Sequence, residues 1–286
     1  NWLMKKKNVG KAIRCPYHFW TYDLEGKLKA APHIGGTNQH KPKGFNFSNH
    51  GLKPIRIHIW YDWIFVNLSG KAKKFVDYAK PLIKKFKDTD FKKLKYAATL
   101  DFGKINSNWK FLIENFIEPY HVQFVHKTTT NQPLKDHYTI VDGICYGSGI
   151  NVKKEDEKNS NALSVTSRYL SLFPNFIISN YFPNQIGVYL NVPISPVETI
   201  QKRIIYTSDG KNMTEEESNT AKKIWWNVHK EDHNICERLQ EGRLSPVSNQ
   251  GGLLSPYWEK GVQAFQKLII DATMKSSKAK KGRKNV

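Results

Sequence analysis

The sequence predicts an α+β protein in which a small β domain precedes a larger domain, where helices cover an antiparallel sheet. Three patterns indicate this arrangement. Short β segments separated by turn signals occupy residues 15–68, alternating residues occupy 165–206, and helical periodicity lies before and after the second region. A chain of 286 residues with 39% hydrophobic content is long enough to bury a sizeable core.

The first domain is expected over residues 1–70. Turn signals at DLEG and GG divide it, and its last strand, IRIHIWYDWIFVNL, is rich in β-branched and aromatic residues. After Gly70 the chain becomes basic, and apolar residues recur at helical spacing at Phe75, Tyr78, Ala79, Leu82 and Phe86. We therefore expect a linking helix on the surface over 71–95 and a domain boundary near Gly70.

The second domain is expected over residues 71–286. From Trp109 a helical pattern continues until Pro119, where the missing backbone donor forces a kink or a restart. The segment 165–206 predicts strands of an antiparallel sheet, with prolines at edges or bends.

A long helix is expected over residues 213–240. Thr214 is its predicted N-cap, and the three glutamates that follow lie where the helix dipole favours anions. In two polar segments, apolar residues do not recur at a regular spacing. KKEDEKNSN at 153–161 predicts a surface loop, and the basic tail from Lys275 predicts disorder.

The net charge of +20 makes nucleic acid a partner to consider. The lysines are spread over the chain, however, and no aromatic-rich binding motif accompanies them. We therefore expect no nucleic-acid partner, and expect the positive field to steer an acidic electron-carrier protein instead. No stretch approaches the roughly eighteen apolar residues of a spanning helix, and the charged opening is not a secretory signal, so no membrane association is expected.

Cysteine is sparse, with only Cys15, Cys145 and Cys236 in the chain. This small, odd number argues against a disulfide framework and for a reducing, cytoplasmic location. A cysteine with a special role is then expected to bind metal. In CPYHFW, Cys15 and His18 flank a tight turn and can point at one metal. The alternative is a small core cysteine beside a solvent-facing histidine.

A second group of polar residues, in ENFIEPYHVQFVH, brings Glu118, His121 and His126 near the broken helix end. Two histidines and one carboxylate leave positions open at which ferrous iron meets dioxygen and substrate. The two histidines are five residues apart, which places them about 140° from each other around a regular helix. They can therefore share a metal only if the helix deforms. Otherwise they are two unrelated, partly buried histidines.

A carboxylate for such a site lies in the helix IWWNVHKEDHNICERLQEG. Spacings of three and four place Asp232 on an apolar stripe with Trp225, Val228, Ile235 and Leu239. A buried carboxylate needs a partner, either a metal ion or a lysine or arginine in a salt bridge. The neighbouring carboxylates fall off the stripe and are expected to be solvated; they are Glu231 and Glu237.

Together, these sites resemble the alpha subunits of Rieske non-haem iron oxygenases, the aromatic-ring-hydroxylating dioxygenase type. CPYHFWTYDLEGKL is similar to the second half of a Rieske cluster motif, and NWKFLIENFIEPYHVQFVH is similar to the iron-binding segment. KEDHNICERLQEG is similar to the later helix that supplies an aspartate. The resemblance spans nearly the whole chain, including WIFVNL, and implies a helix-grip-like catalytic domain.

The resemblance implies two cofactors. A [2Fe-2S] cluster would take Cys15 and His18 as its second ligand pair, and a mononuclear Fe(II) would take His121, His126 and Asp232. The family's first cluster pair, C-x-H, is absent upstream of Cys15, and residue 1 is asparagine. We therefore expect an N-terminally truncated sequence in which the first domain is only part of a Rieske domain.

The resemblance also implies a mono- or dioxygenase that hydroxylates or demethylates an aromatic or small organic substrate with O2. A ferredoxin or flavin reductase would supply electrons, which would cross between subunits of a homotrimer through Glu118. Asn108 and Asn115 match family positions near the iron. Two alternatives of other classes stay open: a zinc-type metallohydrolase, and a Rieske-like electron-transfer protein without oxygenase activity.

Overall fold

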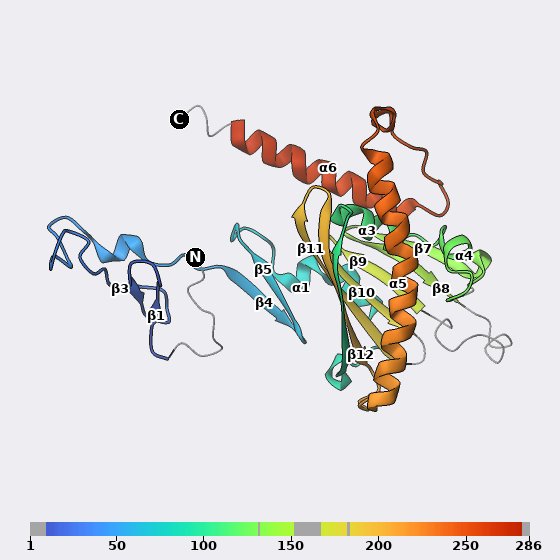
Figure 1. Ribbon diagram of the computed structural model, residues 1–286, viewed down its shortest axis with the longest axis horizontal. Helices are drawn as coiled ribbons and strands as arrows, with labels where there is room; N and C mark the ends of the chain where they lie inside the picture. The colour runs from blue at the N-terminus through green and yellow to red at the C-terminus, as the bar shows by residue number, and fades with distance from the viewer. Residues whose placement is uncertain (1–9, 131, 152–166, 182–183, 282–286) are drawn as a thin grey trace. The chain divides into compact units, whose positions relative to one another are not determined.

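The computed structural model describes the backbone of residues 10–130, 132–151, 167–181 and 184–281. Its side chains are described up to residue 274. The chain divides into two compact units, Asn1–Lys73 and Lys74–Val286, and each is described by itself. Figure 1 shows their helices and strands. In the described part, no helix combines the length and the apolar character needed to cross a membrane.

The first unit contains a small antiparallel sheet of order β1-β2-β3 and a separate hairpin of β4 and β5. The elements are β1 Ile13–Arg14, β2 Thr21–Tyr22, β3 Leu28–Ala30, the 3-10 helix η1 Phe47–His50, β4 Arg56–Trp60 and β5 Trp63–Asn67. The predicted turn at DLEG joins β2 to β3, and Gly26 there has the positive φ of 83° that favours glycine. Tyr22, Leu28 and Ala31 form the buried centre of this sheet.

The second unit is built on a seven-stranded antiparallel sheet of order β6-β12-β11-β10-β9-β8-β7. Its strands are β6 Lys95–Ile105, β7 His137–Asp142, β8 Cys145–Ile150, β9 Ser167–Leu172, β10 Phe176–Tyr181, β11 Gln185–Ser195 and β12 Glu198–Thr207. The antiparallel strands predicted over 165–206 are therefore confirmed within the described residues. The loop predicted at 153–161 lies outside them.

The helices of the second unit are α1 Phe75–Tyr78, α2 Lys80–Lys85, η2 Phe91–Lys93, α3 Trp109–Ile117, α4 Val122–Val125, η3 Leu134–Asp136, α5 Glu215–Arg243, η4 Pro246–Gln250 and α6 Lys260–Lys281. Three of them, α3, α5 and α6, cover one face of the sheet (Figure 1). On β10, Ile177 packs with residues of α3 and α6, and Tyr181 packs with residues of α5. Since these two positions share a face of the strand, all three helices lie on that face.

Two local predictions are wrong. The linking helix expected over 71–95 is instead two short helices and a 3-10 turn, with Pro81 in the first turn of α2, and β6 already begins at Lys95. The disorder expected from Lys275 does not hold as far as Lys281, because α6 continues to that residue. Four of the last seven residues of this helix are lysines, which favour helix.

The long helix α5 begins as predicted. Thr214 Oγ1 accepts a hydrogen bond from Glu217 N, and the Glu217 side chain accepts one from Thr214 N, which completes a capping box. The apolar stripe is shorter than expected, because Leu239 is 49% exposed. Gln240 faces inward instead, and its Oε1 accepts a hydrogen bond from Asn108 N.

Candidate metal centre

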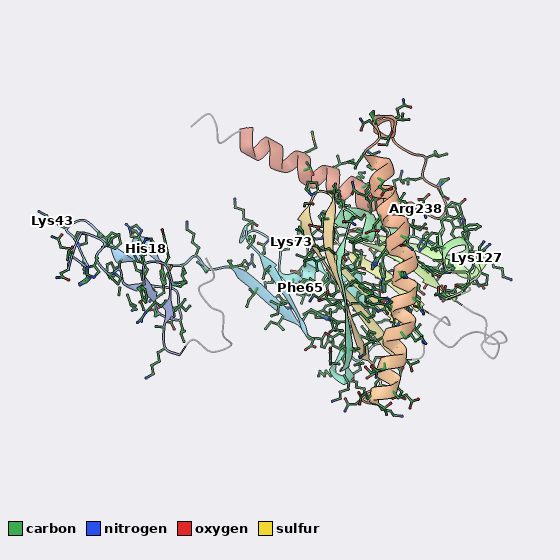
Figure 2. All side chains as sticks on the ribbon, in the orientation of Figure 1. His18, Lys43, Phe65, Lys73, Lys127 and Arg238 are labelled. Atoms are coloured by element: carbon green, nitrogen blue, oxygen red, sulfur yellow. The ribbon has the colours of Figure 1, made fainter. Side chains whose placement is uncertain are left out.

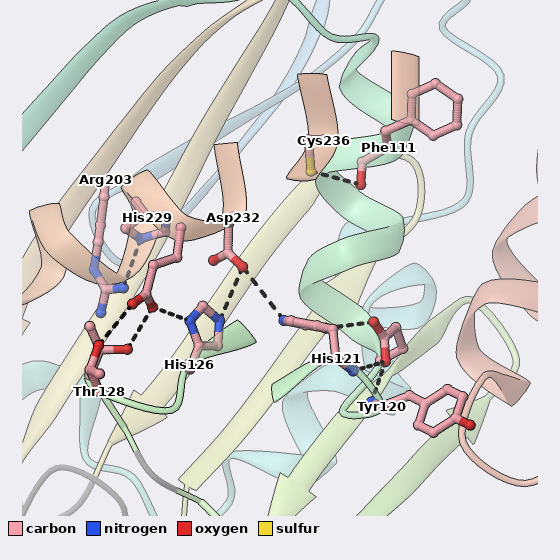
Figure 3. A network of polar contacts seen from close by, with 12 residues as sticks. Phe111, Tyr120, His121, His126, Thr128, Arg203, His229, Asp232 and Cys236 are labelled. Atoms are coloured by element: carbon pink, nitrogen blue, oxygen red, sulfur yellow. Dashed lines mark hydrogen bonds and ion pairs between the residues drawn. The ribbon is translucent and has the colours of Figure 1, made fainter. Parts of the chain in front are cut away.

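Two of the predicted ligands flank the point where a helix breaks. α3 ends at Ile117, because Pro119 lacks the N–H that the next turn would need. The chain restarts as the one-turn helix α4, with His121 directly before it and His126 directly after it. The two rings therefore approach each other, with 5.2 Å between their centroids. Figure 3 shows Asp232 of α5 facing both histidines.

The three side chains present two imidazole nitrogens and one carboxylate oxygen to each other. Asp232 Oδ1 lies 3.0 Å from His126 Nε2 and 3.5 Å from His121 Nε2. One ligand atom from each residue lies within 4.8 Å of the others, and no other such group of three occurs in the described part of the chain. Asp232 Oδ1 is buried without a hydrogen bond of normal geometry, so the protein alone does not satisfy it.

In each histidine, the second ring nitrogen, Nδ1, contacts a glutamate carboxylate. Glu118 Oε1 lies 2.5 Å from His121 Nδ1, and Glu231 Oε2 lies 2.7 Å from His126 Nδ1. Nε2 is thus the nitrogen that remains for a metal in both rings. The prediction that Glu231 is solvated is wrong, because the segment after His126 meets α5, where Thr129 Oγ1 donates to the Glu231 carboxylate at 2.7 Å.

Burial and charge act in opposite directions at these residues. Burial raises the pKa of Asp232, but the neighbouring His126 and His121 outweigh it and hold that pKa well below its usual range. Burial lowers the pKa of His126, but Asp232 and Glu231 outweigh it and raise the pKa to about 9. In the protein alone, a protonated His126 therefore balances Asp232.

The donor set fits a mononuclear ferrous iron. Two imidazoles and one carboxylate, with the remaining positions open, are the ligands of non-haem iron oxygenase sites. A divalent cation would take over the charge balance that a protonated histidine now provides, and it would satisfy the buried Asp232 oxygen.

A partly open cavity of the second unit adjoins the three ligands. Aromatic side chains make up much of its wall, namely Phe116, Tyr169, Tyr181, Tyr189 and Trp225. Asn115 also lines it. Such a concave, aromatic-rich space beside a metal-ligating group has the character of a small-molecule site.

Asn108 does not line this cavity, and the expectation that it lies near the iron is wrong. It is the N-cap of α3, where its Oδ1 accepts a hydrogen bond from Lys110 N, and its Nδ2 donates to the Pro196 carbonyl at 2.6 Å. The nine residues of α3, about 14 Å of helix, separate it from the broken end.

Two histidines and an arginine of the cavity wall were not singled out from the sequence, namely His137 on β7, His229 on α5 and Arg203 on β12. Burial lowers the pKa of His137 to about 4, and burial together with Arg203 lowers that of His229 well below its usual range, so both rings are neutral. The one sequence signal that Arg203 faces the core is the alternation of inward- and outward-facing residues along β12. It occupies the same face of β12 as the buried Ile205.

Cys15 and His18 lie in one tight turn of the first unit. Phe19 N donates to the Cys15 carbonyl at 3.0 Å, and Cys15 N donates to the Trp20 carbonyl at 2.8 Å. Cys15 is a half-buried free thiol, and His18, labelled in Figure 2, is exposed with its ring 3.8 Å from that of Tyr17. Among the described residues, no further ligand completes a metal-binding group with this pair.

Comparison with known families identifies both parts of the chain. Residues 83–275 match the family described as ring hydroxylating alpha subunit (catalytic domain), and residues 3–41 match the Rieske [2Fe-2S] domain. The chain belongs to the ring-hydroxylating alpha-subunit family. This confirms the predicted family and its α+β fold, and the catalytic-domain match argues against a zinc hydrolase or an isolated electron carrier.

Curated relatives of this alpha subunit include choline and carnitine monooxygenases. Choline monooxygenase of Atriplex hortensis is 26% identical over 257 residues, which cover 88% of this chain and 57% of that protein. The carnitine monooxygenase oxygenase subunit of Acinetobacter pittii is 26% identical over 280 residues, 93% of this chain and 72% of that protein. The chain thus spans little more than half the length of the choline monooxygenase.

Solved structures share the fold. A quaternary ammonium Rieske monooxygenase in complex with gamma-butyrobetaine matches with a TM-score of 0.68 and 20% identity, over 91% of this chain and 71% of that chain. Naphthalene 1,2-dioxygenase from Rhodococcus sp. bound to indole matches with a TM-score of 0.66 and 16% identity, over 91% of this chain and 74% of that chain. The molecules bound in these two structures differ in their chemistry, so this likeness does not select a substrate.

Proposed function

We propose that the intact protein is a Rieske-type oxygenase that hydroxylates or demethylates an aromatic or small organic substrate with dioxygen. The observation that carries the proposal is the convergence of His121 Nε2, His126 Nε2 and Asp232 Oδ1 beside an aromatic-rich cavity. These atoms would hold a ferrous iron, which supplies dioxygen activation when bound.

The chain's own residues prepare the site for this chemistry. Glu118 and Glu231 hold the imidazoles with Nε2 toward Asp232 and increase their basicity as ligands. The aromatic wall offers a packing surface to an organic molecule. The neutral His137 has two buried, unpaired ring nitrogens on this wall and can exchange a hydrogen bond with a substrate.

The proposed electron source is a [2Fe-2S] cluster in residues 1–70, with residues 71–286 as the catalytic domain. Cys15 and His18 would each supply a ligand to one of its two irons, and a C-x-H pair in the intact protein would complete the set. A ferredoxin or flavin reductase would reduce the cluster. In a homotrimer, Glu118 would connect the cluster of one subunit to the iron of the next, because its carboxylate already contacts His121.

The location and the substrate class are also part of the proposal. All three cysteines are free thiols, which supports a reducing compartment such as the cytoplasm. The relatives, which are choline and carnitine monooxygenases, add quaternary ammonium compounds to the aromatic compounds expected from the family.

The experiment that tests this function measures metal identity and oxygen use. The chain loaded anaerobically with ferrous iron should bind one iron at the histidine–aspartate group. The intact protein, with a reductase and NADH, should consume oxygen only when a substrate of the right class is added. Exclusive binding of zinc, or a metal-free site at saturating iron, would contradict the proposal.

A further inference from the structure

The cavity wall contains a buried arginine that the proposed metal site does not use. Arg203 lies on the helix-covered face of the sheet, and its side chain is fully buried. Its Cζ atom lies 3.5 Å from the ring centre of Trp225 and 5.0 Å from the ring centres of both Tyr181 and Tyr189. Figure 3 shows Arg203 beside His229 of α5.

This guanidinium has no carboxylate partner in the part of the chain that the structure describes. Its Nη1 donates to the Tyr189 hydroxyl and lies 3.2 Å from His229 Nε2. Nε and Nη2 are buried and make no hydrogen bond. These two donors share one edge of the guanidinium, and that edge can bind both oxygens of a carboxylate.

A glycine of the neighbouring strand lets the guanidinium pack closely against the sheet. A Cβ at Gly187 of β11 would lie 2.8 Å from Arg203 Nη2 and 2.9 Å from Ser179 Oγ, so a larger residue would displace the guanidinium. Glycine weakens the interior of a strand, and close approach of another group accounts for its presence here. The position of Arg203 is therefore built into two neighbouring strands.

The arginine also changes what the aromatic residues can bind. The rings of Tyr181, Tyr189 and Trp225 could surround a cationic ligand through cation–π contacts. The guanidinium of Arg203 already lies over these rings, and it would repel a second cation placed next to it. The unpaired charge and the two free donors instead favour a negative group.

We propose that Arg203 binds the carboxylate of a small organic acid and thereby orients the substrate toward the metal site. His229 contacts Arg203 and lies three residues, about 4.5 Å along the helix axis, before Asp232 on α5, so a molecule of a few carbon atoms can span the two groups. The oxidation rests on the proposed function, whereas the binding of a carboxylate does not. Aromatic acids and betaines meet this requirement, and choline does not.

The test is calorimetric titration of the whole chain with two matched pairs: benzoate with benzyl alcohol, and glycine betaine with choline. Within each pair, a carboxylate replaces a CH2OH group on the same framework. We expect at least one carboxylate to bind about tenfold or more tightly than its alcohol, as a charge-assisted two-donor contact provides. Equal affinities within both pairs, tighter binding of the alcohols, or no detectable binding of either carboxylate would overturn the proposal.

Variants assign the effect to the arginine. Arg203→Met should remove the preference for the carboxylate, and Arg203→Lys, which keeps the charge but not the two-donor edge, should weaken it. Arg168→Met is the matched control, because this arginine of β9 lies on the opposite face of the same sheet and donates to the Lys85 carbonyl. A folded Arg203→Met variant that keeps the preference would contradict the assignment.

Iron content, measured on the same samples, separates this inference from the proposed function. A chain that prefers carboxylates but binds no iron would contradict the proposed function alone. A chain that binds iron and shows no carboxylate preference would contradict this inference alone. If Arg203→Met does not fold, as judged by circular dichroism and thermal unfolding, the matched pairs on the unaltered chain still decide.

Discussion

Glu231 holds the imidazole of His126 from a position 105 residues further along the chain, through a contact of 2.7 Å at Nδ1. The next residue of α5, Asp232, meets Nε2 of the same ring at 3.0 Å. Consecutive carboxylates of one helix thus contact opposite sides of one histidine. The first fixes the ring, and the second is the proposed metal ligand beside it.

Glu231→Ala should weaken iron binding by roughly ten- to a hundredfold, because the His126 ring loses the partner that fixes its orientation and its tautomer. The measurement is an anaerobic titration with ferrous iron. Glu241→Ala, an exposed change on the same helix, is the control and should bind iron like the unaltered chain. Unchanged affinity in the Glu231 variant would show that the contact does not support the metal.

Asp232→Ala should abolish binding of the mononuclear iron. Two neutral imidazoles without a charged third ligand hold ferrous iron poorly. Iron per chain, measured by elemental analysis after desalting, should fall to the background, while Asp271→Ala on the exposed side of α6 should change nothing. A folded Asp232 variant with full iron content and activity would rule out Asp232 as the ligand.

Glu118→Gln in the intact protein should leave both metal centres filled but slow the passage of electrons between them. The amide keeps the size of the side chain and loses the charge-assisted contact with His121 Nδ1. Rapid-mixing spectroscopy should show normal reduction of the cluster and slower reoxidation in the presence of substrate and oxygen. Reoxidation at the normal rate would exclude Glu118 from the electron path.

The chain of 286 residues should not assemble a stable Rieske cluster. Cys15 and His18 supply one ligand to each iron, whereas the cluster needs two protein ligands on each. Anaerobic reconstitution followed by electron paramagnetic resonance of the reduced sample should give no Rieske signal, and a chain extended upstream with a C-x-H pair should give one. A full signal from the shorter chain would mean that other residues complete the site.

The cysteines should differ sharply in their reaction with iodoacetamide. Burial raises the pKa of Cys145 to about 12 and that of Cys236 well above its usual range, and the reactive species is the thiolate. At pH 8 the folded chain should therefore be alkylated at the half-buried Cys15 alone. In denaturant, all three cysteines should be alkylated. Mass spectrometry of the digests gives the sites, and rapid labelling of Cys145 in the folded chain would contradict its burial.

Some features of the site follow from residues that are close in sequence. Pro119 ends α3 through its own covalent structure, and Thr214 starts α5 through a reciprocal bond with Glu217. These effects act within a few residues, so the broken helix and the helix that carries Asp232 could both be predicted. The motifs around them were specific enough to name the family.

The partners of two charged residues depended on the tertiary structure. Glu231 meets His126 because the segment around Thr129 meets α5, and Arg203 is covered because Trp225 of α5 lies over β12. No local pattern contains these contacts, since they join elements that are far apart in the chain. The environment of a charge decides whether it is solvated, paired or available to a ligand, and the packing of α5 across the sheet creates that environment here.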